Sequence, residues 1–283
     1  MRPHSAAIPA LAVSLATAFA SPTLAEPTQK ELEARAAARE KELSKQGFTV
    51  LVEAPWVVIG DGPAKEVRGI ATGFLRRITS QLEADFFGKR PDKLLEVWLF
   101  SSERSFRKGA KKFFDDTPDT PYGYYSPTAG ALIMNANGLG TLSHELVHPL
   151  IEINFPDCPS WFNEGLASLF ERPSEKKGHI VGLVNWRLPN LKKQIRGKTL
   201  PDLRKLLTTS REEFYGADWD AYAQARYLVY YLQQHDKLHP FFDAFVKAKD
   251  HTGITSLEEV LGESLDDFEP TWRAWVMKLA EDR

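Results

Sequence analysis

The feature that most constrains how this chain can fold is a pair of histidines four residues apart, followed by a glutamate sixteen positions further on. His144 and His148 belong to the run SHELVH, and Glu164 belongs to the run WFNEG. On an α-helix, residues four apart lie on one face, so both rings can point towards one centre. The fold is therefore expected to bring the segment with Glu164 close to the helix that carries the histidines.

These residue types suit a metal ion. Two imidazole nitrogens and one carboxylate fill three positions of a tetrahedral Zn²⁺ site and leave the fourth open for water. We therefore predict one zinc ion held by His144, His148 and Glu164. Glu145 stands one step round the helix, where it can act as general base on that water and then pass the proton to the leaving group.

The residues around the motif are typical of two helices that approach each other. Apolar residues recur at helical spacing through the first run. Thr141 or Ser143 is expected to cap the start of the first helix, and Ser160 the start of the second. Gly165 and Ala167 have little bulk, so the second helix is expected to lie close to the first.

Pro149 directly follows His148 and lacks the amide that would bond to the carbonyl of Glu145. Proline also disfavours α geometry in the residue before it. We expect the helix either to kink here or to pass through a local bulge. Metal-bound histidines usually donate their other N–H to a carboxylate or carbonyl, and three residues could accept these bonds: Glu152, Asn163 and Glu171.

Residues 1–25 are predicted to be a signal peptide that is removed from the mature protein. Arg2 is positively charged, positions 6–20 are apolar and rich in alanine, and small residues offer cleavage after Ala20 or Ala25. The chain is therefore expected to be exported, to the periplasm or to the extracellular space. The apolar run is too short to span a membrane comfortably, and no comparable run follows it.

The composition argues against a nucleic-acid partner. The formal net charge of the 283-residue chain is −2, and it becomes −3 when Arg2 is lost with the signal peptide. Proteins that bind nucleic acid usually carry a basic patch and a high pI. Cys158 is the only cysteine, so no intrachain disulfide can form, and we interpret this residue as a loop thiol rather than a ligand.

A second pair of histidines four apart, His235 and His239, is interpreted differently. The pair lies between two predicted helices, Pro240 is typical of a helix start, and no nearby helix offers a carboxylate. We interpret His235 as the end of a helix and His239 as a loop residue, and we do not predict a second metal site.

After the signal peptide, the sequence divides into a short charged segment and one larger domain. Residues 26–46 are rich in Ala, Glu, Lys and Arg with few apolar anchors, which is typical of a solvated helix or a tether. Residues 47–283 are predicted to form the domain. Its expected parts are a sheet-bearing part at 47–137, the motif helices at 139–171 and a helical C-terminal part at 199–283.

Alternating and helical apolar patterns predict the elements of this domain. Strands are expected at 48–52, 56–59, 94–100, 123–125 and 131–136. Helices beyond the motif are expected after Pro63 and at 103–114, 222–234, 240–249 and 266–280. The stretch from Glu171 to Lys198 is expected to be looped. Strands first and helices later indicate an α+β fold.

The motif residues support a family resemblance. His144-Glu145-x-x-His148 followed by the run WFNEG resembles the gluzincin metallopeptidases, especially the bacterial exported proteins called peptidase-MA-like. The resemblance implies a zincin fold with a thermolysin-like catalytic core and a polypeptide substrate. It also implies that an edge strand before the motif helix pairs with an extended peptide, and here that strand would be Ala131 to Ala136.

In that family a tyrosine or histidine usually stabilises the charge that develops on the substrate oxygen. The resemblance implies Tyr222 for this role, at the start of a predicted helix. Tyr124, Tyr125 and Tyr215 are the other contenders. Several tyrosines share the helix of Tyr222, and aromatic stripes of this kind usually pack a core instead.

Three functions follow from these observations. The leading one is an exported zinc-dependent peptidase. The second is a zinc amidase that acts on a cell-wall or other non-protein amide with similar chemistry. The third is a catalytically weak zinc-binding module, but Glu145 argues against it, because a structural site needs no base and usually fills all four positions.

Overall fold

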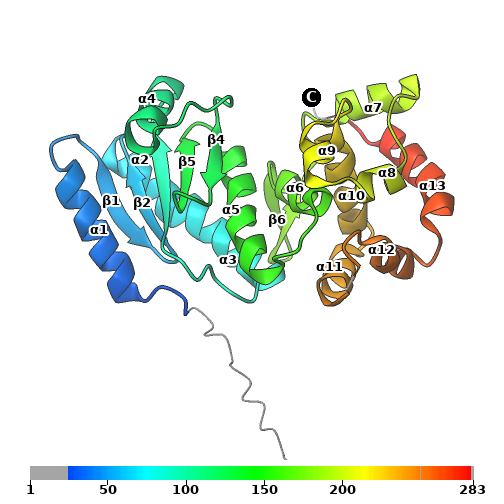
Figure 1. Cartoon of the computed structure of the whole chain (residues 1–283), viewed down its shortest axis with the longest axis horizontal. Coiled ribbons are helices and arrows are strands. Elements are labelled where there is room, and N and C mark those ends of the chain that lie inside the picture. Colours follow the sequence, from blue (N-terminus) through cyan, green and yellow to red (C-terminus); the bar gives the residue numbers. More distant parts are fainter. Residues whose placement is uncertain (1–24, 249, 282–283) are drawn as a thin grey trace, which may run out of the picture.

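The computed structural model describes residues 25–248 and 250–281 (Figure 1). The predicted signal peptide, apart from Ala25, lies outside the described residues, and so does Lys249 at the end of one predicted helix. Within the described ranges, no helix combines the length and the apolar character needed to cross a membrane.

The protein has a mixed α+β fold with a five-stranded sheet in the order β1-β2-β3-β5-β4. Its strands are β1 (Thr49–Glu53), β2 (Trp56–Gly60), β3 (Leu95–Phe100), β4 (Gly123–Ser126) and β5 (Ala131–Asn135). β2, β3 and β5 run parallel, whereas β1 and β4 pair antiparallel at the two edges. The five predicted strands and the α+β class are thus confirmed.

Helices cover both faces of this sheet, as Figure 1 shows. Successive side chains of a strand point to opposite faces, so each strand contributes to two cores. On β3, Leu95, Val97 and Leu99 join the larger core, while Trp98 and Phe100 join a smaller one. The double burial explains why these strands are apolar along their whole length.

The smaller core lies beneath α1 (Gln29–Leu43) and α4 (Glu103–Phe114). Thr28 caps α1, and Leu32 and Leu43 are buried against the sheet. The guanidinium of Arg39 donates two hydrogen bonds, of 2.8 and 3.1 Å, to the carboxylate of Glu96 on β3. The segment at 26–46 is therefore a helix that forms part of the fold, and the alternative of a tether is wrong.

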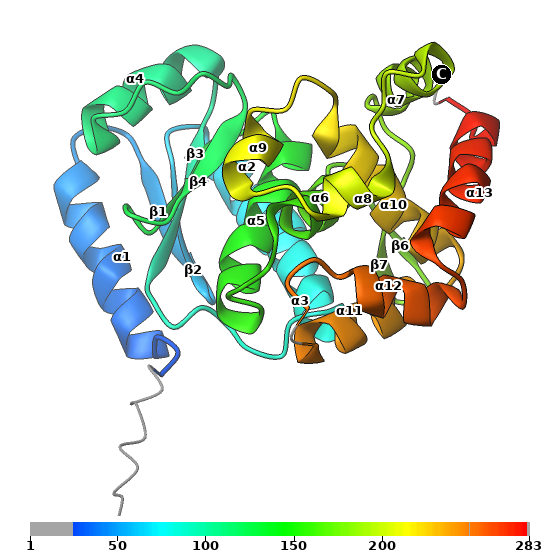
Figure 2. The same ribbon diagram turned by 45° about the vertical axis from the view of Figure 1, so that its right-hand side comes forward.

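The larger core lies on the other face of the sheet. It contains side chains of α2 (Ala64–Gly69), the π-helical segment η1 (Ile70–Leu75) and α3 (Arg76–Asp85), which run on from one another. The motif helix α5 (Leu139–Asn154) contributes to the same core and lies between the sheet and the C-terminal helices in both views (Figures 1 and 2). The motif therefore lies where the sheet-bearing part of the molecule meets its helical C-terminal part.

The starts of the two motif helices differ from the prediction. Gly138 is the N-cap of α5, and Pro159 is the N-cap of α6 (Ser160–Leu169), neither with a side-chain cap bond. The helices begin earlier than expected, so Ser143 lies inside α5, where its hydroxyl donates to the carbonyl of Phe170 at 2.6 Å. Thr141 also lies inside α5, and Ser160 is the first helical residue of α6.

Two glycines permit close contacts around these helices. A Cβ at Gly140 would lie 2.3 Å from the carbonyl oxygen of Glu171, so the start of α5 touches the chain just after α6. A Cβ at Gly165 would lie 3.1 Å from the carbonyl oxygen of Ala225 on α10 (Ala221–Gln234). The two motif helices lie close to each other as expected, but Gly165 does not provide this approach, because it faces α10.

Pro149 lies inside α5 without ending it. Residues 139–154 are α-helical throughout, so of the two expected distortions, a kink or a local bulge, the bulge is absent from this helix. The missing amide of Pro149 removes one helical hydrogen bond, but the surrounding residues are buried and hold the helix by packing. His148 therefore remains one helical turn from His144.

The stretch after Glu171 is more ordered than predicted. It forms a hairpin of β6 (Pro173–Lys176) and β7 (His179–Gly182), followed by α7 (Leu188–Gly197). The side chain of Gln233 bonds to both the amide and the carbonyl of Gly182, at 2.7 and 2.9 Å. The expectation of a loop is wrong because tertiary contacts, rather than a local apolar pattern, hold this hairpin.

The C-terminal part is helical, as predicted. Its remaining helices are α8 (Leu203–Leu207), α9 (Arg211–Tyr215), α11 (Leu238–Lys247), α12 (Ile254–Leu261) and α13 (Leu265–Lys278). Trp272 and Val276 are buried, and Trp275 and Leu279 pack against the core, which confirms the predicted apolar stripe. Arg226 of α10 is fully buried and donates to the carbonyl of Ser168 at 2.9 Å, next to the C-terminus of α6.

Candidate metal centre

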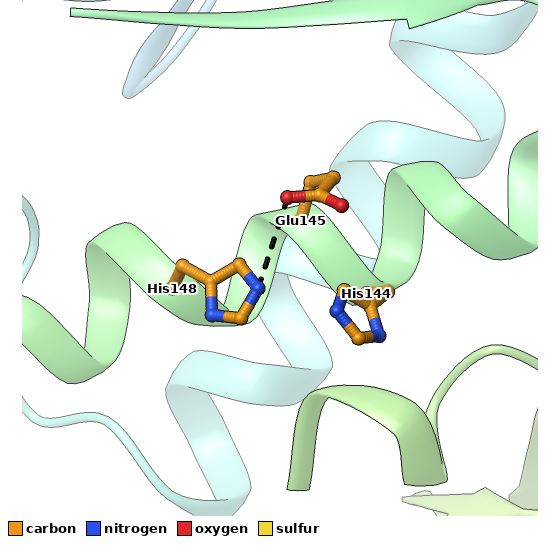
Figure 3. A group of neighbouring side chains, drawn as sticks. All are labelled: His144, Glu145 and His148. Carbon is orange, nitrogen blue, oxygen red and sulfur yellow. Dashed lines mark ion pairs between the residues drawn. The ribbon is translucent and has the colours of Figure 1, made fainter. Parts of the chain in front are cut away.

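Three residues of α5 form a compact group that could hold a metal ion. The ligand atoms of His144, Glu145 and His148 all lie within 4.8 Å of one another. Figure 3 shows that all three side chains come from this one helix, and Nε2 of His148 lies 3.7 Å from Oε2 of Glu145. The two imidazole rings have their centroids 5.0 Å apart. The spacing of the motif thus brings these residues together, as predicted.

Glu164 is not part of this compact group but reaches His144 from α6. Its Oε2 atom lies 3.2 Å from Nε2 of His144, and both side chains are buried. Among the residues that the structure describes, this oxygen has no hydrogen-bond partner. A buried carboxylate oxygen without a donor normally costs free energy, so the arrangement fits a cation beside it.

The outer ring nitrogens of the two histidines face polar side chains. Nδ1 of His148 lies 2.7 Å from Oδ1 of Asn163, which leaves Nε2 free to bind a metal. Nδ1 of His144 lies 3.6 Å from Oε1 of Glu171, too far for a hydrogen bond. Glu152, the third predicted partner, bonds elsewhere: it accepts from Lys93 at 2.9 Å and from the hydroxyl of Tyr125 at 2.8 Å.

Glu171 is held by a network that the sequence did not reveal. The guanidinium of Arg187 donates two hydrogen bonds to its carboxylate, at 2.8 and 2.6 Å. The amide of Asn185 donates a third at 2.8 Å. Arg187 and Asn185 lie in the connection before α7, a stretch without any recognisable motif. Only the tertiary fold places them behind His144.

Glu145 is fixed by the edge strand of the sheet. The backbone amide of Tyr125, on β4, donates to Oε2 of Glu145 at 2.9 Å. Burial raises the pKa of Glu145, and the nearby His144 and His148 oppose this rise. The net effect is a raised pKa, so the carboxyl group of Glu145 takes up a proton more readily than an exposed glutamate does.

The electrostatic balance of the centre favours positive charge. Burial alone lowers the pKa of His144, but its 3.2 Å contact with Glu164 and the charges of Glu145, Glu164 and Glu171 raise the pKa to about 9. Burial raises the pKa of Glu164, but His144, His148 and Tyr215 lower the pKa to about 2. These carboxylates thus stabilise a positive charge between the two helices, whether a proton or a metal ion carries it.

A cleft of about 420 Å³ opens onto this group, and the four tyrosine candidates all line it. The hydroxyl of Tyr215 donates to Oε1 of Glu164 at 2.6 Å, and that of Tyr125 is bonded to Glu152. Tyr222 is partly buried and, within the described part of the chain, its hydroxyl forms no hydrogen bond. Tyr222 is therefore free to donate, whereas Tyr215 is engaged with a candidate ligand.

The single cysteine and the second histidine pair lie outside the compact group on α5. Cys158 is in the loop between α5 and α6 and lines the cleft, and burial raises the pKa of its thiol. His235 follows the end of α10, and its Nδ1 lies 2.8 Å from the carbonyl oxygen of Tyr231. His239 lies inside α11 and stacks on Phe86 at 4.7 Å, so its assignment to a loop is wrong.

The edge of the sheet beside the cleft is β4, not β5. β5 pairs with both β3 and β4, so it is an interior strand. The prediction that Ala131 to Ala136 forms the edge is therefore wrong. The first strand of the hairpin, β4 (Gly123–Ser126), is the outermost strand of the sheet and lies beside α5.

The motif and its surroundings define the class of this protein structurally: an α+β domain in which two helices bring two histidines and two glutamates together. Residues 138–253 match a family described as "Protein of unknown function (DUF1570)". The matched region runs from the N-cap of α5 past α11 and includes His144, Glu145, His148, Glu164 and Tyr222. A search of curated proteins finds no match.

Proposed function

We propose that this protein is a zinc-dependent metallopeptidase with a zincin-like core. His144, His148 and Glu164 would hold the ion, and Glu145 would act as general base. The observation that carries the proposal is the buried Oε2 of Glu164, which forms no hydrogen bond within the described part of the chain and lies 3.2 Å from Nε2 of His144. A metal ion bound beside this oxygen would compensate its buried negative charge, which the protein contacts alone do not.

The donor set fits zinc. Two imidazole nitrogens and one carboxylate are typical ligands of a catalytic Zn²⁺, and three protein ligands leave a position open. When bound, zinc supplies Lewis acidity that lowers the pKa of water to about 7 and polarises a carbonyl oxygen. Asn163 supports the assignment, because its contact with Nδ1 of His148 directs Nε2 of that ring away from it.

Glu145 would perform the proton transfers of amide hydrolysis. Its carboxylate takes a proton from water as the water oxygen attacks the carbonyl carbon. The carboxyl group then gives this proton to the amide nitrogen as the C–N bond breaks. The amide of Tyr125 orients the carboxylate through the bond of 2.9 Å, so the base is fixed before the substrate arrives.

The edge strand supports a peptide as substrate. A strand at the edge of a sheet offers unpaired backbone groups along one side, and extended peptides bind such edges by strand addition. β4 is an edge strand, and Tyr124 and Tyr125 of this strand line the cleft. The amide of Tyr125 is already bonded to Glu145, so a peptide that pairs with the other outward-facing groups of β4 would pass beside Glu145. Tyr222, with its free hydroxyl, would donate to the substrate oxygen.

The test replaces Glu145 with glutamine, which has nearly the same shape but cannot accept the proton. Turnover of an unfolded protein substrate is expected to fall by about 100-fold or more. Zinc content by mass spectrometry is expected to stay near one ion per chain. Glu152→Gln, a change in the same cleft but away from the motif, serves as the matched control and is expected to keep turnover.

Three outcomes contradict the proposal. Retained turnover in Glu145→Gln excludes the base, and zinc content unaffected by His144→Ala combined with His148→Ala excludes the ligands. Hydrolysis of peptidoglycan fragments without hydrolysis of peptides would indicate a zinc amidase in place of a peptidase.

A further inference from the structure

Two tyrosines that line the cleft, Tyr215 and Tyr222, each have an arginine against the ring. The rings of Tyr215 and Tyr222 lie 6.3 Å apart in an edge-on arrangement. The guanidinium of Arg187 lies 5.2 Å from the centroid of the Tyr222 ring, and that of Arg211 lies 5.0 Å from the centroid of the Tyr215 ring. Each tyrosine therefore carries a cation against its ring, a favourable contact that also orients the guanidinium.

The two arginines differ in how their charge is balanced. Arg187 is paired with the buried carboxylate of Glu171 at 2.6 Å. Arg211 is exposed and, within residues 25–248 and 250–281, forms no ion pair. Arg211 is also the only lysine or arginine among the described residues that line the cleft. A single unbalanced guanidinium thus faces the space above the motif.

The acidic groups of the cleft do not neutralise Arg211. Glu145 and Glu164 belong to the candidate metal centre, and Glu152 is paired with Lys93 at 2.9 Å. The guanidinium is a planar donor whose geometry matches a carboxylate, with which it forms two parallel hydrogen bonds. The cleft therefore offers an incoming molecule one strong anion-binding group close to the motif.

We propose that Arg211 binds a carboxylate of the substrate and so determines which peptides the cleft accepts. This inference rests on the proposed peptidase function. The carboxylate can come from the C-terminus of a peptide or from an Asp or Glu side chain. Tyr215 holds Arg211 in place, and because Tyr215 also donates to Glu164, the anion site has a fixed position relative to the metal centre.

The test measures binding rather than turnover, with the purified, zinc-loaded Glu145→Gln protein. The probes are acetylated tetra-alanine with a free C-terminus, its C-terminal amide, and amidated peptides with one internal Glu or Gln. Isothermal titration calorimetry is expected to show that a charged peptide binds about tenfold more tightly than its uncharged counterpart. Adding Arg211→Gln is expected to abolish that difference, whereas Arg104→Gln, an exposed arginine on α4, is expected to keep it.

The peptides distinguish the two sources of the carboxylate. Preference for the free C-terminus alone indicates an enzyme that recognises chain ends, and preference for internal Glu indicates selection of acidic residues. Equal binding of charged and uncharged peptides, no binding of any probe, or the same loss for all probes in Arg211→Gln would overturn the proposal. If the wild-type protein hydrolyses none of these peptides but the Arg211-dependent difference persists, the peptidase proposal fails and the anion site stands.

Discussion

The two carboxylate oxygens of Glu164 have different surroundings. Oε1 accepts a hydrogen bond of 2.6 Å from the hydroxyl of Tyr215, whereas Oε2 lies 3.2 Å from Nε2 of His144 and accepts no hydrogen bond from any residue in 25–248 or 250–281. The bond to Oε1 fixes the rotation of the carboxylate and directs Oε2 towards the histidines. Tyr215 is therefore a positioning residue that acts through Glu164.

Tyr215→Phe is expected to weaken zinc binding about tenfold, because groups that orient a metal ligand typically contribute 10–100-fold to affinity. The measurement is a competition titration of zinc between the protein and a chromophoric chelator. Tyr222→Phe is the matched control on the same wall of the cleft. Its hydroxyl contacts no candidate ligand, so this change is expected to leave zinc affinity unchanged and to lower kcat.

This pair of substitutions separates the roles of the two tyrosines. A loss of zinc affinity in Tyr222→Phe, or none in Tyr215→Phe, would show that the hydroxyl on Glu164 does not orient a ligand. The split between affinity and kcat also guards against a general loss of folding, which would change both quantities in either variant.

At the scale of residues, the sequence predicts the centre but not its support. The four-residue spacing alone places His144 beside His148, since helical geometry is local. Tyr215 lies 51 positions from Glu164, and no pattern connects them. Asn163 is next to Glu164 in the chain, so its contact with His148 could be predicted from the sequence. The contact of Arg187 with Glu171 could not be predicted, because it depends on how the chain runs before α7.

At the scale of elements, the close contact between the start of α5 and the chain just after α6 depends on Gly140. The carbonyl of Glu171 occupies the space where a side chain would begin, 2.3 Å from an ideal Cβ. The contact holds the start of the motif helix against the residue that lies behind His144. Any side chain at position 140 must therefore move one of the two backbones.

Gly140→Ala is expected to destabilise the protein by about 1–3 kcal/mol, the usual cost of overpacking. Urea unfolding followed by tryptophan fluorescence measures this change. Gly69→Ala is the matched control: Gly69 has helical angles, φ −61° and ψ −42°, and no atom lies within 4 Å of its added Cβ. It is expected to be neutral or stabilising by about 0.5–1 kcal/mol, because alanine loses less entropy in a helix. A Gly140→Ala protein as stable as Gly69→Ala would show that the close contact is unimportant.

Elements with their own periodicity were predictable, and elements fixed by distant contacts were not. α4 was predicted with its observed bounds, Glu103–Phe114, because its apolar face repeats at helical spacing. The β6–β7 hairpin has a polar first strand of four residues and a two-residue Lys177-Gly178 turn, and Asp85 and Gln233 hold it through hydrogen bonds to the second strand. The order of β4 and β5 in the sheet depends on which one β3 pairs with, which a local pattern cannot specify.

At the scale of the whole molecule, the sheet separates the motif from α1. α5 packs in the larger core and α1 in the smaller core on the opposite face. Glu96 on β3 is buried beneath α1, where Arg39 and the indole N–H of Trp98 donate to it. A buried carboxylate that loses its cation is costly, so α1 stabilises the sheet on which the motif helix rests.

Arg39→Ala is therefore expected to lower the free energy of unfolding by about 2–4 kcal/mol, because it leaves Glu96 buried with weaker compensation. Arg35→Ala is the matched control one turn earlier on α1: Arg35 is more exposed and lies 3.6 Å from the same carboxylate, so its loss is expected to cost about 1 kcal/mol or less. Urea unfolding is expected to remain a single transition in both variants, since α1 shares a core with the sheet. Zinc content is expected to stay unchanged, because the substitution lies across the sheet from α5. An early separate transition in Arg39→Ala, with the rest of the unfolding curve unaltered, would contradict this prediction. It would show that α1 unfolds independently and that the sheet supports the candidate metal centre without it.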